Sequence, residues 1–300
     1  LMNYYMPPYK AAHEAGVATY MASFNEIGGV PSTASKFLFT DLLRNDWGFK
    51  GFVVTDYTGI NELVPHGVAA DEKEAGELAA NAGIDMDMTG AVFSKYLKQS
   101  VEEGKVSEET INNAVRRILE MKFILGLFDD PYRYLDKERE KNTIMKPEFL
   151  QAARETAARS IVLLKNEKSF FPITKDKSLT VALIGPMVKD KVNQNGEWAG
   201  KGNREQSVSL YEGLTEKYAG TNVKFVYAQG CDLTTDNRDG FAEALATARR
   251  ADVVLAVMGE DFNWSGEAAS RSDIRLPGAQ QELLKELKKT GKPVGVVLMN

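Results

Sequence analysis

Residues 17–56 read VATYMASFNEIGGVPSTASKFLFTDLLRNDWGFKGFVVTD and contain two short apolar segments separated by a stretch with helical periodicity. Residues 17–24 and 51–56 have the composition of buried strands. Between them, residues 35–47 repeat apolar side chains at helical spacing, and Ser35 is a suitable N-cap. A crossover of this length joins parallel strands. The stretch therefore predicts a βαβ unit.

The same alternation continues along the first half of the chain. It predicts three βα units, which do not close a barrel. They match the last third of a (β/α)8, TIM-like barrel whose front would precede Leu1. The other elements expected here are a strand at 83–88 and helices at 4–16, 71–81, 93–103 and 107–125.

The second half of the chain predicts a separate α/β domain. Residues 128–146 are polar and charged and form the expected linker. Apolar strands that alternate with helices then predict a mostly parallel sheet covered on both faces, an α/β sandwich. The predicted domains are 1–127, with the barrel part, and 147–300, with an incomplete sandwich. The expected strands are 179–184, 223–227, 252–258 and 293–299, and the expected helices are 147–160, 209–218, 240–250 and 278–290.

Composition excludes several classes of function. The 300 residues carry a net charge of -5 without a basic block, which argues against a nucleic-acid partner. One cysteine and two histidines predict neither an intrachain disulfide nor a metal site built from these residues, and no cofactor is predicted. No apolar run reaches about 18 residues, so no membrane-spanning segment is expected.

Active-site residues of such barrels come from the carboxyl ends of the strands. Asp56 follows a strand directly and stands beside Tyr57, so it is the leading candidate for a nucleophilic carboxylate next to an aromatic ring that packs on a sugar. The same pattern also fits an aspartate that caps a helix or lies in a loop. Asp85 and Asp87 alternate with apolar residues near the next strand end, and structural hydrogen bonding is the favoured interpretation for both.

The second domain offers further carboxylates after the strand at 252–258. Open α/β sheets bind ligands beyond the carboxyl ends of their strands, which makes Glu260 and Glu267 candidates. Solvated loop carboxylates are the alternative. Trp198 lies among glycines in NQNGEWAGKGN, where a ligand or another domain is its expected contact. The glycine spacing in that segment does not match a dinucleotide-binding loop.

Four segments resemble glycoside hydrolase family 3, in particular the bacterial periplasmic β-glucosidases. They are ASFNEIGGVPS at 22–32, LLRNDWGFKGFVVTDY at 42–57, AGIDMDM at 82–88 and SRSDIRLPGAQ at 270–280. The resemblance extends over essentially the whole chain, and both ends look cut from something longer. It implies the barrel part followed by the sandwich, with the active site between them.

The resemblance also implies roles for individual carboxylates. Asp56, in the TDY motif, corresponds to the nucleophile of the family. Glu267, in SGEAASR, corresponds to the acid/base, with Glu260 as its rival. In a retaining mechanism two such carboxyl groups lie about 5–5.5 Å apart.

Substrate-binding residues are expected around these carboxylates. Met21, Phe24 and Tyr57 match positions that line the sugar subsite in the family, and many members have tyrosine where this chain has Phe24. Trp198 completes the predicted set. A metal is not part of it.

These residues predict a retaining, exo-acting β-glucosidase that removes terminal β-D-glucosyl residues from an oligosaccharide or glycoside through a covalent glycosyl-aspartate. The alternatives are a β-xylosidase or N-acetylglucosaminidase of the same superfamily and a non-catalytic carbohydrate-binding relative. A nucleotide-binding α/β protein is the weakest alternative, because no phosphate loop is present. The periplasm is the expected location, although no signal peptide is visible, and a homodimer is left open as the oligomeric state.

Overall fold

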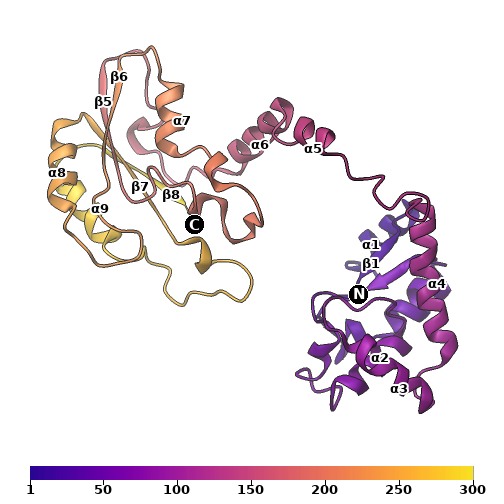
Figure 1. Cartoon of the computed structure of the whole chain (residues 1–300). Helices are drawn as coiled ribbons and strands as arrows, with labels where there is room; N and C mark the ends of the chain where they lie inside the picture. Colours follow the sequence, from indigo (N-terminus) through magenta and orange to yellow (C-terminus); the bar gives the residue numbers. More distant parts are fainter. Residues whose placement is uncertain (300) are drawn as a thin grey trace. The chain divides into compact units, whose positions relative to one another are not determined.

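The computed structural model describes residues 1–299, which form two compact units (Figure 1). Unit 1 comprises Leu1–Ala153, and unit 2 begins at Arg154. Both units combine helices with parallel strands, which confirms the predicted α/β class. No helix among the described residues has the length and apolar character needed to cross a bilayer.

Unit 1 consists mainly of helices around a small sheet. Its last helix, α6, continues past the division into unit 2. The strands are β1 (Thr19–Met21), β2 (Glu26–Ile27), β3 (Val30–Pro31) and β4 (Phe52–Val54), and the helices are α1 (Met6–Glu14), η1 (Ser32–Ala34), η2 (Phe37–Asp46), η3 (Asn61–Leu63), α2 (Glu72–Ala82), α3 (Val92–Glu102), α4 (Glu108–Ile124), α5 (Lys137–Thr143) and α6 (Pro147–Ser160).

The sheet that positions the candidate site is formed by β1 and β4. They pair in parallel, with Met21 opposite Val54. The strand predicted at 83–88 is reduced to one parallel bridge between Met86 and Val54. Val53, at the centre of β4, is fully buried in the apolar core of the unit. Within residues 1–299 these parallel segments form an open sheet rather than a closed barrel.

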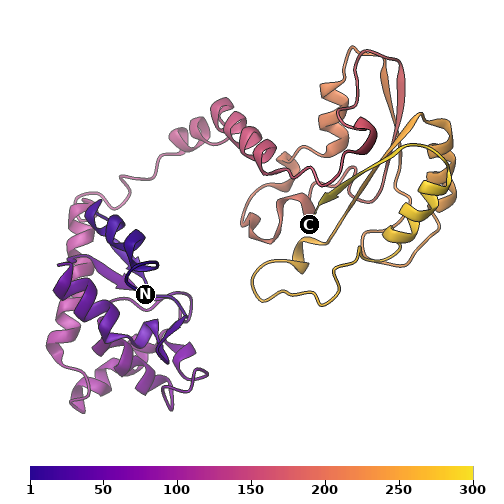
Figure 2. The same ribbon diagram turned by 180° about the vertical axis from the view of Figure 1, so that it is seen from behind.

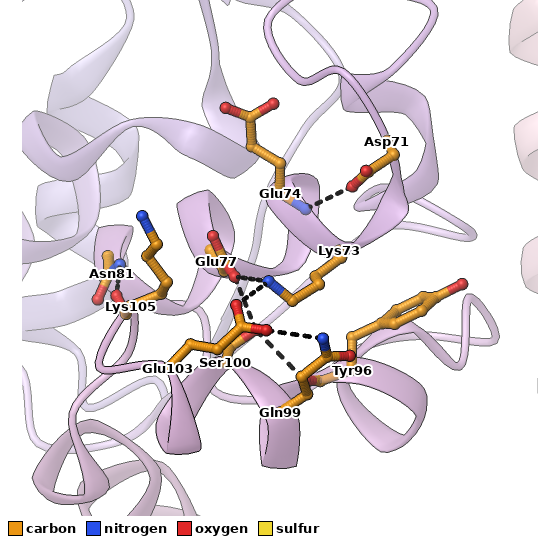
Figure 3. A network of polar contacts seen from close by, with 10 residues as sticks. All are labelled: Asp71, Lys73, Glu74, Glu77, Asn81, Tyr96, Gln99, Ser100, Glu103 and Lys105. Carbon is orange, nitrogen blue, oxygen red and sulfur yellow. Dashed lines mark hydrogen bonds and ion pairs between the residues drawn. The ribbon is translucent and has the colours of Figure 1, made fainter.

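Helices α2 and α3 are joined by a polar network on their surface (Figure 3). Lys73 Nζ lies 2.6 Å from Glu103 Oε2 and 2.8 Å from Glu77 Oε1. Ser100 donates to the same oxygen of Glu77 at 2.8 Å. The hydrogen bonds to Glu103 and Glu77 raise the pKa of the Lys73 amino group above its ordinary value. The network thus ties the two helices together while their other sides contribute to the apolar core.

Besides the short helices η1 and η3, which are not expected from the sequence, η2 and α5 of unit 1 differ from the expectation. η2 has the wider hydrogen bonding of a π-helix where an α-helix is predicted. Over ten residues the apolar spacing does not separate these two helix types. α5 lies inside the predicted linker, and the side chain of Asp136 starts it by accepting from the Arg139 N–H at 2.9 Å.

Unit 2 contains all four strands predicted for the second half, in the order β6-β5-β7-β8 and all parallel. The strands are β5 (Leu179–Ile184), β6 (Val223–Ala228), β7 (Val253–Gly259) and β8 (Val294–Met299). The helices are η4 (Glu167–Ser169), η5 (Asn193–Asn195), η6 (Glu197–Ala199), η7 (Arg204–Gln206), α7 (Leu210–Lys217), α8 (Phe241–Arg250), η8 (Phe262–Trp264) and α9 (Gln280–Lys289).

Helices cover both faces of this sheet (Figure 1). Ile184 and Ala256 point from their strands into a cluster with α8 and α9. Leu183 and Leu255, which alternate with them, point into a second cluster with α7. Because the central strands β5 and β7 are buried on both faces, they are almost continuously apolar, as is usual for a parallel sheet between helices. The edge strands β6 and β8 expose alternate residues.

The single cysteine lies in the first of these clusters, and its chemistry is testable. Cys231 is 4% exposed. Burial, together with the nearby Asp232 carboxylate, raises the pKa of its thiol to about 11. Because the thiolate is the reactive form, we expect almost no labelling of Cys231 by an aromatic disulfide reagent at pH 8 in the native protein, and full labelling in guanidinium chloride. Peptide mass spectrometry measures both, and rapid native labelling would contradict the buried placement.

Candidate active site

The carboxyl ends of β1 and β4 bring together four of the predicted site residues. Met21 is the last residue of β1 and lies opposite Val54 of β4. Phe24 follows β1 closely, and Asp56 and Tyr57 follow β4. Because the two strands are parallel neighbours, all four residues lie at one edge of the sheet.

A tight turn holds Asp56 at this edge. The Gly59 N–H donates to the Asp56 carbonyl at 3.0 Å, and Thr58 has a left-handed backbone conformation with φ of 54°. The chain is bound to Met88 on both sides of Asp56. The Met88 N–H donates to Thr55 Oγ1 at 2.9 Å, and the Met88 carbonyl accepts from the Thr58 N–H at 2.9 Å. These two bonds fix the backbone that carries the Asp56 carboxylate.

Exposed side chains lie at the same sheet edge as Asp56. Tyr57 is 62% exposed and Met21 is 56% exposed, whereas Asp56 itself is half-buried. Asp56 Oδ1 accepts from the Tyr57 N–H at 2.6 Å, and Oδ2 has no partner among residues 1–299. A positioned carboxylate with an available oxygen can act as a nucleophile, and an exposed aromatic ring can pack against a sugar.

Two neighbouring aspartates have structural partners, as the sequence predicts. Asp85 is buried, and its two oxygens are ion-paired with Arg44 at 2.5 Å and Arg117 at 2.7 Å. One oxygen of Asp87 accepts from the first two N–H groups of α3, at 2.6 and 3.2 Å. The other oxygen of Asp87 has no hydrogen-bond partner within the described residues, but it is buried, whereas the oxygen of Asp56 without a partner is not. Solvent access, rather than the lack of a partner alone, distinguishes Asp56 at this edge.

In unit 2 the remaining candidates lie at a reversal of strand order. The chain passes from β5 to β6 on one side and later to β7 on the other, and ligands of open α/β sheets bind beyond the strands at such a point. Gly185, which directly follows β5, approaches β7 so closely that a Cβ there would lie 2.0 Å from the Val257 carbonyl oxygen. The tryptophan loop (residues 185–209) carries Trp198, and the glutamate loop (residues 260–279) carries Glu260 and Glu267.

Figure 2 shows the tryptophan loop (salmon) and the glutamate loop (gold) at the same end of the sheet. The Phe262 N–H donates to Asn193 Oδ1 at 3.0 Å, and the Arg204 guanidinium lies 4.0 Å from the centre of the Phe262 ring. Gly266 lies against the carboxylate of Glu197, where a Cβ would come within 1.7 Å of Oε2. The two loops therefore support each other, and glycine is required at the residue before the predicted acid/base.

The two candidate glutamates differ in their surroundings. Glu267 is exposed, and its carboxylate has no hydrogen-bond or ion-pair partner in the described part of the chain. Glu260 is half-buried and forms an ion pair with Arg271. The ion pair thus occupies the carboxylate of Glu260, whereas that of Glu267 is open to solvent. Trp198 is 74% exposed.

Arg271 is the residue of this site that the sequence does not reveal. It lies in the segment SRSDIRLPGAQ, but no spacing rule connects it to Glu260, which is eleven residues away. Among residues 1–299, no cluster of His, Cys, Asp and Glu has the geometry to hold a metal ion.

Two family models match the chain. The Glycosyl hydrolase family 3 N terminal domain matches residues 1–121, and the Glycosyl hydrolase family 3 C-terminal domain matches residues 161–300. The chain belongs to glycosyl hydrolase family 3. Within this family 3 chain, Asp56 falls in the N-terminal match and Glu267 in the C-terminal match.

Several relatives of this family 3 chain are known. A periplasmic beta-glucosidase of Salmonella typhimurium is 38% identical, with 100% of this chain and 42% of the relative covered. A beta-xylosidase of Formosa agariphila is 35% identical, with 100% of this chain and 43% of the relative covered. The crystal structure of a beta-glucosidase from Listeria innocua in complex with isofagomine matches 98% of this chain and 40% of that chain, with a TM-score of 0.86 and 34% identity. The chain thus spans less than half the length of these relatives.

Proposed function

We propose that this family 3 chain is part of a retaining, exo-acting β-glucosidase that hydrolyses terminal β-D-glucosyl residues of an oligosaccharide or glycoside. The observation that carries the proposal is the placement of Asp56. It is a half-buried carboxylate with an available oxygen, held by a tight turn that follows β4, at the sheet edge that also carries the exposed residues Met21 and Tyr57. The similarity to a periplasmic beta-glucosidase supports the substrate class.

In the proposed reaction, Glu267 gives a proton to the glycosidic oxygen while Asp56 attacks the anomeric carbon. The bond to the leaving group breaks, and a covalent glycosyl ester of Asp56 forms. Water, from which Glu267 removes a proton, then attacks the anomeric carbon and releases the sugar with retained configuration. This scheme uses an ionised nucleophile and a protonated acid, and it needs no metal or organic cofactor.

Further residues are assigned to the sugar. Met21, Phe24 and Tyr57 would contact the terminal sugar, and Trp198 would contact either that sugar or the leaving group. Phe24 offers an apolar face without a hydroxyl donor. A β-xylosidase is the second candidate, because a beta-xylosidase relative is 35% identical over the whole chain. Xylose differs from glucose by lacking the hydroxymethyl group, so contacts to that group separate the two activities.

We also propose the finer features of the parent fold and location. Residues 1–127 would be the C-terminal part of a (β/α)8 barrel, residues 128–146 a linker, and residues 147–300 an incomplete α/β sandwich. The periplasm is proposed by analogy with the periplasmic relative. A homodimer is the proposed oligomeric state, and a sedimentation measurement on the complete protein tests it.

The test of the function is covalent trapping in the complete protein. The fluorine of a 2-deoxy-2-fluoro β-glucoside slows both the formation and the hydrolysis of the glycosyl-enzyme. A good leaving group speeds up only the formation, so the glycosyl-enzyme accumulates. We expect the intact mass to increase by one fluoroglucosyl group, located on Asp56 in the peptide GFVVTDY. The matched fluoroxyloside, used in parallel, tests the second candidate by its relative rate of trapping.

The outcomes of trapping separate the hypotheses. An adduct on another carboxylate would overturn the assignment of Asp56. The absence of any adduct, together with the absence of aryl glycoside hydrolysis, would overturn the proposed function and favour a non-catalytic relative.

A further inference from the structure

One buried side chain joins the two ends of the glutamate loop. Gln280 is fully buried. Its Oε1 accepts from the Gly259 N–H at 3.0 Å, and its Nε2 donates to the Gly259 carbonyl at 2.9 Å and to the Leu233 carbonyl at 2.7 Å. The amide is thereby satisfied at three sites, and the start of the loop is bound to its end. This closure does not determine the conformation of the residues between them.

A second closure crosses the middle of the same loop. The Arg271 guanidinium forms an ion pair with Glu260 at the end of β7. It also lies 4.8 Å from the centre of the Trp264 ring and donates to the Arg275 carbonyl at 3.1 Å. Both charged side chains are 21% exposed, so water competes with the pair less than at an open surface. The contact between the Trp264 ring and the Arg271 guanidinium thus joins the two ends of segment 264–271, and Glu267 lies near the middle of this segment.

Besides the packing of Gly266 against Glu197 and a 3.4 Å hydrogen bond from the Ala269 N–H to the Gly266 carbonyl, this closure supports the backbone that carries Glu267. Its carboxylate has no hydrogen-bond or ion-pair partner within the described residues. Ala268 and Ala269, which follow it, line an open hollow together with Trp264 and Arg271. The backbone on both sides of Glu267 is therefore arranged around the guanidinium. A planar guanidinium can pair with a carboxylate and stack on a ring at the same time, which an ammonium group does less well.

We infer that Arg271 is a positioning residue for proton transfer by Glu267, with Glu260 as its counter-ion. The inference rests on the proposed function, in which Glu267 is the acid/base. Loss of Arg271 releases residues 264–271 from Trp264 and from Glu260 at the end of β7. The carboxyl group of Glu267 then spends less time within reach of the glycosidic oxygen. A displacement of about 1 Å at a reacting group costs roughly 10²-fold in rate.

The test uses the dependence on the leaving group in the complete protein. For Arg271→Met we expect kcat/KM to fall about 10²-fold for an alkyl glycoside, whose leaving group needs a proton. For the dinitrophenyl glycoside of the same sugar we expect a fall of less than about threefold, because that leaving group departs without protonation. The kcat/KM value is compared because it reports the first step, in which the proton is given. Added azide should also raise the kcat of the variant on the dinitrophenyl glycoside, because azide attacks the glycosyl-enzyme without a general base.

The loop provides a matched control. Arg275 pairs with Asp273, two residues away, and this exposed local pair does not cross the loop. Arg275→Met should therefore leave both substrates within about twofold of the wild type, since exposed pairs contribute little. Arg271→Lys should fall between wild type and Arg271→Met for the alkyl glycoside. Glu260→Gln should repeat the pattern of Arg271→Met, and the double variant should be no worse than either single variant.

Several results would overturn the inference. An equal loss on both leaving groups would show a general loss of structure, and no loss on the alkyl glycoside would show that Arg271 does not position the acid. Melting temperatures of all variants identify the first case. If Glu260→Ala, rather than Glu267→Ala, gave the β-glycosyl azide product with added azide, Glu260 would be the acid/base and the inference would fail. A wild-type protein that hydrolyses no glycoside would instead overturn the proposed function itself, before any variant is compared.

Discussion

Replacing Asp56 with alanine should lower the kcat of β-glucoside hydrolysis by about 10⁴-fold or more, as expected when a covalent nucleophile is removed. The loss should include dinitrophenyl glycosides, because a good leaving group does not replace the attack on the anomeric carbon. Asp46→Ala is the control for the same chemical change, since Asp46 is exposed at the end of η2. Steady-state rates of both variants at matched concentrations measure the difference.

The stereochemistry of chemical rescue then separates a nucleophile from a structural aspartate. Azide can occupy the space left by the Asp56 carboxylate and attack a dinitrophenyl β-glucoside from the α face, which gives an α-glycosyl azide. With Glu267→Ala, azide attacks the glycosyl-enzyme and gives the β-glycosyl azide. An Asp56→Ala protein that keeps more than about a tenth of wild-type activity, or that gives the β product, would contradict the assignment of Asp56.

The sheet of unit 2 shows what a sequence can predict about this fold. All four predicted strands are present, with boundaries that differ by one residue or less. The central strands β5 and β7 are buried on both faces and are almost continuous apolar runs, whereas the edge strands β6 and β8 expose alternate residues. All four lie between helices with regular periodicity. The signal is strong because a parallel sheet between two helical layers offers no polar face. The βαβ unit of residues 17–56 is also predicted, although β1 is shorter than expected and exposes two of its three residues.

The elements that differ depend on contacts that a linear pattern does not contain. The strand predicted at 83–88 keeps only one bridge at Met86. Two of its side chains, Asp85 and Asp87, make hydrogen bonds to other elements instead of standing on a regular strand. α5 is missed because its residues are charged all round, so it lacks the apolar face by which helices are recognised. Its remaining signal is Asp136 as an N-cap.

In the candidate site, too, some residues can be predicted from the sequence and others cannot. Asp56, Met21 and Tyr57 follow from a general rule, because ligands bind at the carboxyl ends of parallel strands. The choice between Glu260 and Glu267 does not follow from that rule, since both come after β7. It depends on the ion pair that occupies Glu260, which is a contact between side chains separated along a folded loop.

Replacing Asp85 with alanine should destabilise the protein by about 3–5 kcal/mol, the cost of leaving buried positive charge unpaired. The Asp85 side chain is 1% exposed and meets Arg44, which is 11% exposed, and Arg117. It also accepts from the Val53 N–H of β4 at 2.8 Å. The substitution therefore removes two ion pairs and a hydrogen bond to the strand that carries Asp56. A fall of roughly 10 °C in the melting temperature of the lowest transition is expected.

Two comparisons show whether burial is the cause of this loss. Glu14→Ala removes an ion pair with Lys10 whose side chains are 61% and 55% exposed, and we expect a change of less than about 0.5 kcal/mol. Asp85→Asn keeps one oxygen that accepts from the Val53 N–H and from Arg44, but it removes the charge and places an NH2 group against the Arg117 guanidinium. Because the acceptor for β4 is retained, we expect it to destabilise less than alanine does. Equal, small effects of Asp85→Ala and Glu14→Ala would mean that the network contributes little. The strand end would then depend on the Thr55 and Thr58 hydrogen bonds to Met88, and Thr55→Val would be the variant with the larger loss of stability.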